Sequence, residues 1–190
     1  MDETDTAPSW SLSVTGNPRP FELFVRDALR LDTTAEETSP PPLVPYPADH
    51  SSILTSLERQ RVEELWPEWW RAHVAADPLN DTDRAVGPEI ERVASLLEPL
   101  SHERARREPP HELDTTALTA LDCGAIAADV AARRGVALAR VRGRILVYGV
   151  EGPWRRLAAP GVLLCSALDL QAQPAAVVHD VLESSVDDPA

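Results

Sequence analysis

The sequence predicts an α+β fold, in which a mainly helical middle segment precedes a small C-terminal module with the order helix, three strands, helix. Two observations carry this prediction. Apolar residues recur at three- and four-residue spacing in residues 21–31, 53–74 and 90–100, the period of amphipathic helices. Between residues 144 and 166 they gather instead into short runs separated by Gly-Pro and Pro-Gly turns, which is typical of strands. A hydrophobic content of 43% in 190 residues suffices for a packed core.

Residues 1–50 are predicted to form an acidic, proline-rich arm or linker that the rest of the chain does not need for folding. This segment holds eight of the 18 prolines and nine acids against three arginines. Within it, the spacing of Phe21, Phe24, Val25 and Leu29 predicts one short amphipathic helix over residues 21–31. So short a helix must dock to be stable, either on its own chain or in a groove of a partner. Residues 40–47 predict an extended polyproline-type linker.

Residues 51–110 form the helical segment. A helix is expected from Ser51 or Ser52 onward, with a kink or a restart at Pro67. Trp66, Trp69 and Trp70 then lie on one helical face, because they occupy positions i, i+3 and i+4. One interpretation is a core wedge, in which the three indoles are buried and join this helix to the layer beneath it. The other is an exposed anchor for a partner, since tryptophan is enriched at interface hot spots.

After a polar loop over residues 77–87, a second helix is expected to begin at Pro88 and to bend or end at Pro99. The charged residues 101–110 end in two prolines and predict a boundary. Neither the acids of the loop nor the histidines near this boundary have the spacing of a calcium or zinc site. We therefore predict no metal.

Residues 111–186 form the predicted α+β module, and residues 187–190 a frayed tail. A helix capped by Asp114 or Thr115 is expected to end at Gly135. Strands are expected over residues 144–150, 154–157 and 162–166, joined by turns at residues 151–153 and 160–161 into an antiparallel meander. Pro174 is expected to open the last helix.

The charge pattern points to partners. The chain carries 18 arginines, no lysine and 31 acids, a net charge of −13, yet seven arginines fall between Arg133 and Arg156 with Glu151 as the only acid. An acidic chain favours basic protein partners and opposes nucleic acid. In an extended segment, Arg140, Arg142 and Arg144 would share one side, with Val141 and Ile145 on the other. Arg155 and Arg156 extend the strip. This face can receive either the chain's own acidic N-terminal arm or an acidic surface of a partner.

Residues 129–141, Asp-Val-Ala-Ala-Arg-Arg-Gly-Val-Ala-Leu-Ala-Arg-Val, are similar to the start of the helix-turn-helix in LacI-type repressors. That resemblance implies a second, DNA-reading helix after Gly135. The competing interpretation is a helix that ends at Gly135 and leads into a strand, which the β-branched residues between 136 and 147 favour.

Several features bear on the compartment and on chemistry. Two cysteines, Cys123 and Cys165, are too few for a disulfide framework and favour a reducing cytoplasm. We expect no secretory signal and no membrane insertion, because no apolar run approaches about 20 residues. Arginine without lysine, with abundant alanine and proline, is typical of a GC-rich bacterial genome. No nucleophile elbow, phosphate loop or Cys-x-x-Cys pair occurs, and we predict no cofactor.

The sequence thus favours a non-catalytic, cytoplasmic bacterial component that binds another protein or itself: an adaptor, a chaperone, an assembly factor or an immunity-like protein. One alternative is a nucleic-acid-associated regulator that uses residues 129–156. A second is a small enzyme without a recognisable motif. The predicted partner-binding residues are Phe21, Phe24, Trp66, Trp69, Trp70, Arg140, Arg142, Arg144, Arg155 and Arg156.

Overall fold

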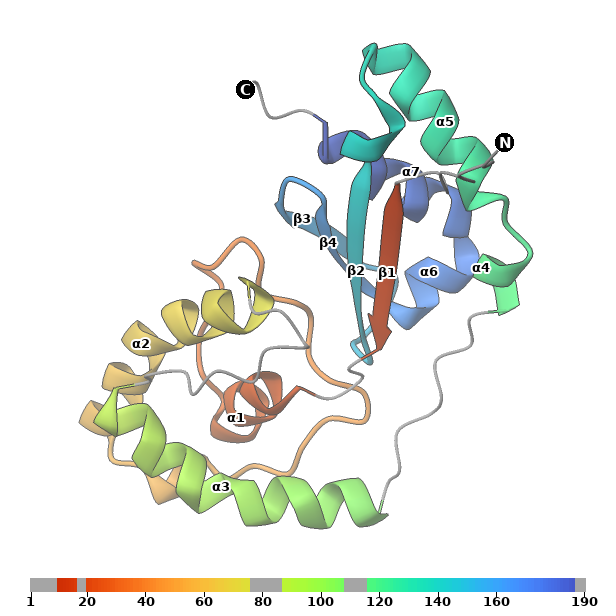
Figure 1. The fold of residues 1–190 in the computed structure, drawn as a ribbon. Helices are drawn as coiled ribbons and strands as arrows, with labels where there is room; N and C mark the ends of the chain where they lie inside the picture. Colours follow the sequence, from red (N-terminus) through yellow and green to blue (C-terminus); the bar gives the residue numbers. More distant parts are fainter. Residues whose placement is uncertain (1–9, 17–19, 76–86, 108–115, 187–190) are drawn as a thin grey trace, which may run out of the picture. The chain divides into compact units, whose positions relative to one another are not determined.

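The computed structural model describes residues 10–16, 20–75, 87–107 and 116–186, and in these residues the predicted α+β fold is confirmed (Figure 1). The chain divides into two compact units. The sheet unit comprises Met1–Asn17, Glu112–Tyr148 and Gly152–Ala190. The helical unit comprises Pro18–His111 and Gly149–Glu151. The units therefore alternate along the chain, whereas we had expected an arm, a helical segment and a module in succession.

The sheet unit contains a four-stranded mixed sheet with the order β1-β2-β4-β3. Strand β1 (Ser11–Gly16) runs parallel to β2 (Arg142–Tyr148), and β2 runs parallel to β4 (Val162–Ser166). Only β3 (Arg155–Ala159) is antiparallel, and it pairs with β4 alone. The expected meander is thus wrong in its pairing, although its three strands exist.

Two local features explain the strand order. No tight turn joins β2 to β3, because Gly149 and Glu151 form backbone hydrogen bonds with Val44 and Pro42 inside the helical unit. Strand β4 also carries buried residues on both faces, Leu163 and Cys165 on one and Leu164 on the other. Such a continuous apolar run is typical of a strand buried on both faces in the interior of a sheet, and β4 accordingly lies between β2, which is parallel to it, and β3, which is antiparallel.

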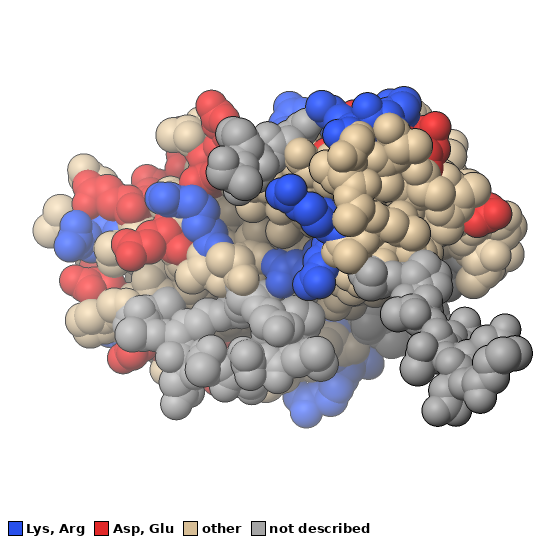
Figure 2. All heavy atoms as spheres, turned by 45° about the horizontal axis from the view of Figure 1, so that its top comes forward, with Lys and Arg blue, Asp and Glu red and all other residues tan. Residues whose placement is uncertain are grey.

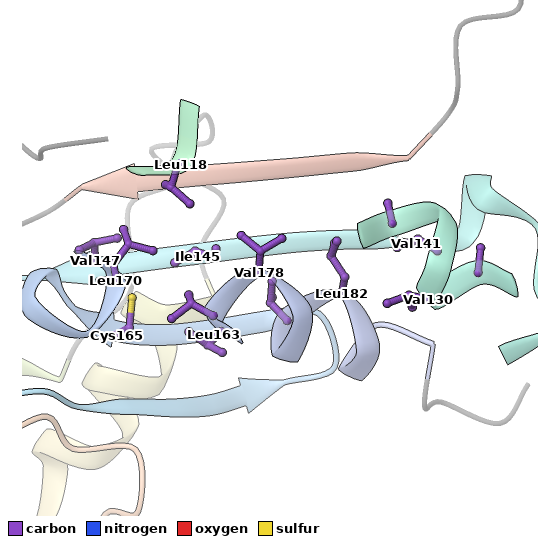
Figure 3. Close-up of a cluster of buried hydrophobic side chains, with 14 residues drawn as sticks. Leu118, Val130, Val141, Ile145, Val147, Leu163, Cys165, Leu170, Val178 and Leu182 are labelled. Atoms are coloured by element: carbon purple, nitrogen blue, oxygen red, sulfur yellow. The ribbon is translucent and has the colours of Figure 1, made fainter. Parts of the chain in front are cut away.

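Helices α5 (Cys123–Arg134), α6 (Ala167–Ala172) and α7 (Pro174–Ser184) cover one face of this sheet, with the short α4 (Thr116–Thr119) beside them (Figure 1). Figure 3 shows the resulting core, in which side chains from alternate positions of β2 and β4 meet those of the helices. Its labelled members are Leu118, Val130, Val141, Ile145, Val147, Leu163, Cys165, Leu170, Val178 and Leu182.

Helix α5 ends at Gly135, which adopts the left-handed conformation at φ 63°. A short 3-10 turn (Leu138–Arg140) follows, and β2 then begins. The second helix implied by the helix-turn-helix resemblance is therefore absent from residues 136–148. The physical reason is that Val141, Ile145 and Val147 are β-branched and bury one side of an extended segment.

The helical unit consists of α1 (Phe21–Leu29), a 3-10 turn (Ser51–Ile53), α2 (Ser56–Ala75) and α3 (Pro88–Arg107). Thr55 and Glu58 form a reciprocal capping box at the start of α2. Helix α2 continues through Pro67, so the alternative of a restart there is wrong, and α3 continues through Pro99 to Arg107, so it does not end at that proline. A proline removes only its own N–H, and packing against neighbouring helices maintains the rest of each helix. The two units divide between His111 and Glu112, just after the charged residues in which a boundary is predicted.

The described part of residues 20–50 is integral to the helical unit. Eight of the nine residues of α1 are buried. The Arg26 guanidinium donates to the carbonyl oxygens of Pro40 and Pro41 at 2.5 and 2.9 Å, and Asp27 Oδ2 accepts from the Leu43 amide at 2.7 Å. The proline-rich segment is thus fixed through its carbonyl groups, which proline retains, and the expected separate arm is corrected.

Candidate functional site

The structure places the predicted aromatic contact residues in the core of the helical unit. Trp66 and Trp70 are fully buried, and Trp69 and Phe24 nearly so. The Trp66 and Trp70 rings stack with their centroids 5.7 Å apart, and Phe21, which is half-buried, meets Trp69 edge-on at 6.1 Å. Of the two interpretations left open by the sequence, burial supports the core wedge.

The polar atoms of the two buried indoles are also satisfied within the unit. Trp66 Nε1 donates to the Glu22 carbonyl at 3.0 Å, and Trp70 Nε1 donates to the Thr38 carbonyl at 3.2 Å. Because these bonds link α2 to α1 and to residues 33–39, the tryptophans stabilise the fold and present no surface to a partner.

The predicted arginines all belong to the sheet unit. The register of the sheet puts Arg142 and Arg144 of β2 on the face opposite the helices. Arg156 of β3 shares that face, because it pairs with Leu164, which pairs in turn with Leu146. Arg140 lies in the turn that leads into β2 and is exposed. We call Arg140, Arg142, Arg144 and Arg156 the arginine face. Arg155 points to the helix side instead.

Charge differs between the two units. The described residues of the sheet unit include seven arginines and five acids, a balance of +2, whereas those of the helical unit include nine arginines and 15 acids, a balance of −6. Figure 2 shows that the arginines visible on this side of the molecule form separate groups with uncharged surface between them. The positive balance among the described residues therefore lies in the sheet unit.

Arginines on the helix side of the sheet unit pair with acids. Arg133 and Arg134 both contact Glu183, at 3.2 and 2.6 Å. Arg155 lies 3.4 Å from Asp169 and 3.2 Å from Asp180.

Three members of the arginine face differ from these paired arginines, because they have no acidic partner in the described part of the chain. Among the described residues, no carboxylate lies within 4.0 Å of Arg140, Arg142 or Arg156. Within the described chain, the side chains of Arg142 and Arg156 donate to backbone carbonyls, those of Ala139 and Arg155.

A groove of about 400 Å³ lies between β3 and α7. Its floor is Leu163, which is buried, and its rim includes Leu157, which is 50% exposed. The remaining lining is polar: Arg155, Arg156, His179, Asp180, Glu183 and Ser184. The sequence analysis did not single out this groove. The available signal was the spacing of His179, Asp180 and Glu183, which puts them together on the solvent side of α7.

The described residues offer little for metal or thiol chemistry. They contain no group of three histidine, cysteine, aspartate or glutamate side chains placed to hold a metal ion. Cys123 and Cys165 are both free. Burial, with a smaller contribution from Asp169, raises the pKa of the Cys165 thiol to about 12. Burial and the neighbouring Asp122 also raise the pKa of Cys123 above its usual range.

We expect these two thiols to react at very different rates. The thiolate is the reactive form, and a pKa of about 12 leaves almost no thiolate on Cys165 at pH 8. A disulfide reagent should therefore label Cys123 in the folded protein, faster as the pH rises, and label Cys165 only after unfolding in denaturant. Mass spectrometry of native and unfolded samples, with Cys123→Ser as control, measures this. Equal labelling of both thiols in the native state would contradict the assignment.

No helix in the described ranges is long and apolar enough to cross a bilayer. No family model, curated protein or solved structure matches the chain. The case for function therefore depends on the geometry above.

Proposed function

We propose that the protein is a non-catalytic component that binds an acidic surface of another protein through the arginine face of its sheet unit. One observation supports this most strongly: Arg140, Arg142 and Arg156 are exposed, and no carboxylate among the described residues pairs with them. Arginine forms bidentate, charge-assisted hydrogen bonds with carboxylates, so such side chains suit a partner rich in Asp or Glu.

The same features weigh against direct reading of DNA. The segment that carries Arg142 and Arg144 is a strand in the sheet, and residues 136–148 contain no second helix for the major groove. The net charge of −13 opposes approach to a phosphate backbone. An adaptor, chaperone, assembly or immunity-like role fits a protein-binding surface. We further propose the bacterial cytoplasm as its location, supported by two free thiols and by arginine without lysine.

Charge reversal tests this proposal. A chain with Arg140→Glu, Arg142→Glu and Arg156→Glu should bind its partner at least about tenfold more weakly, because each exposed pair contributes about 0.2–1 kcal/mol and reversal adds repulsion. The partner is first captured from a bacterial lysate and identified by mass spectrometry. Its affinity for each purified variant is then measured at low and high salt, and the difference should shrink at high salt.

The matched control reverses Arg71, Arg106 and Arg107, three exposed arginines of the helical unit, with the same change in net charge. It should bind within about twofold of the original chain. Equal losses of affinity in both triple variants would show that net charge alone causes the effect, and would overturn the proposal. Salt-sensitive, sub-micromolar binding of the original chain to duplex DNA, lost on reversal of the arginine face, would support a regulator instead.

A further inference from the structure

Strand β3 forms one edge of the sheet. It pairs with β4 on one side, and nothing in the described part of the chain pairs with its other side. The pairing register shifts between Leu157 and Ala159, so the regular part of this edge is residues 155–157. An edge of this kind presents backbone N–H and C=O groups that another strand can bond.

The hydrogen bonds at the start of β3 show which groups are presented. The Ser166 amide donates to the Trp154 carbonyl at 2.8 Å, so these two residues form a bonded pair of the antiparallel ladder. Bonded pairs alternate, and Arg156 with Leu164 is the next one. Arg155 and Leu157 consequently direct their N–H and C=O groups to the open edge. The Arg156 side chain indeed reaches the Arg155 carbonyl, at 3.2 Å.

The groove between β3 and α7 lies beside this edge. Leu157 projects into it half-exposed, over the buried Leu163. A strand added to β3 would place the side chain opposite Leu157 on the same face of the sheet, in the groove. The side chain opposite Arg156 would lie on the other face, next to a guanidinium that has no carboxylate partner among the described residues.

We propose that β3 binds an extended peptide segment of the partner as a fifth strand, and that this segment carries an apolar residue opposite Leu157 and, next to it, an Asp or Glu opposite Arg156. The inference rests on the proposed function, because it identifies the part of the acidic partner that the sheet unit binds. Backbone hydrogen bonds to Leu157 supply affinity, the groove selects the apolar residue, and Arg156 selects the neighbouring acid.

Charge complementarity also decides between an acidic partner and a second copy of this chain. Strand β3 reads Arg-Arg-Leu-Ala-Ala and contains no acid. A second β3 added in the same way would therefore bring no carboxylate to Arg156. It would instead place four arginines, two from each strand, along one strand pair, where their charges repel each other. The acidic segment of a partner removes that repulsion.

The test uses the full chain and a phage-displayed library of random peptides as the probe. Selected peptides should share an apolar residue with an acid directly next to it. Leu157→Pro removes the backbone donor at the open edge and should weaken binding of a synthetic selected peptide by at least about tenfold. Leu157→Val, which retains the donor and an apolar side chain, should stay within about threefold.

A second measurement does not depend on the folding of a variant. Methylating the peptide amide that faces Leu157 should abolish binding to the original chain, whereas methylating the adjacent amide should not. Hydrogen exchange of the Leu157 amide should slow on binding. Selection of no such peptide, or equal binding of the methylated form, would overturn the inference. A dimer that Leu157→Pro disrupts, without peptide binding, would assign the edge to a second copy.

These outcomes are separable from those of the proposed function. Suppose that the double variant with Arg140→Glu and Arg142→Glu weakens partner binding, while Leu157→Pro does not. The arginine face then binds the partner, and strand addition is wrong. If neither variant weakens partner binding, the proposed function itself fails.

Discussion

A chain that begins at Ser51 is expected to lose cooperative unfolding in both units. The deletion removes β1 from the sheet unit and α1 from the helical unit. Leu23, Val25 and Leu29 of α1 are fully buried, and each is worth about 1.5–3 kcal/mol of burial. Their sum is comparable with the whole stability of a typical domain, about 5–15 kcal/mol. The sequence-based expectation that residues 1–50 are dispensable for folding is thereby reversed.

Thermal melts followed by circular dichroism and tryptophan fluorescence measure the effect. A chain that begins at Trp10, and so retains every described element, serves as control and should melt in one cooperative transition per unit. A Ser51 chain that unfolds with the same cooperativity and the same midpoint as this control would show that β1 and α1 are accessory.

Trp66→Ala is expected to destabilise the helical unit by about 3–5 kcal/mol. The substitution leaves a cavity at a fully buried position, removes the stacking partner of Trp70 and leaves the Glu22 carbonyl without its indole donor. Urea unfolding measures the change in free energy. Leu57→Ala, on the same helix but 77% exposed, is the matched control and should change stability by no more than about 0.5 kcal/mol. Comparable effects of the two substitutions would refute the core assignment.

The sequence predicted best those elements whose signal is local. The periodicity from Phe21 to Leu29 indicated α1, Gly135 marked the end of α5, and the turn at residues 160–161 joined two true strands. It missed β1, although Ser-Leu-Ser-Val-Thr-Gly alternates as a strand should. The flanking prolines obscured that pattern, and the partner strand lies more than a hundred residues away in the sequence. Strand order failed for the same reason, because the apolar run of β4 is typical of a central strand but does not identify the strands on either side of it.

The candidate site, like the fold, was predictable from the sequence only where the signal is local. Alternation in β2 correctly placed Val141 and Ile145 inward and Arg142 outward, since a period of two is a property of the strand itself. The tryptophan face could not be assigned from sequence, because a buried wedge and an exposed anchor have the same spacing. The groove beside β3 needed the structure, which brings Leu157 and Glu183 to one cavity from separate elements.

The parallel pairing of β1 with β2 has a consequence for the nascent chain. Ser11 is made 131 residues before its partner Arg142. At about 5–20 residues per second, β1 waits roughly 7–26 s for β2, and the whole of residues 18–111 is synthesised in that interval. The helical unit can therefore begin to compact while the first strand is still unpaired. During this interval β1 has no partner strand. A chaperone that binds β1, or slower decoding of residues 112–141, would therefore change the yield of correctly paired sheet.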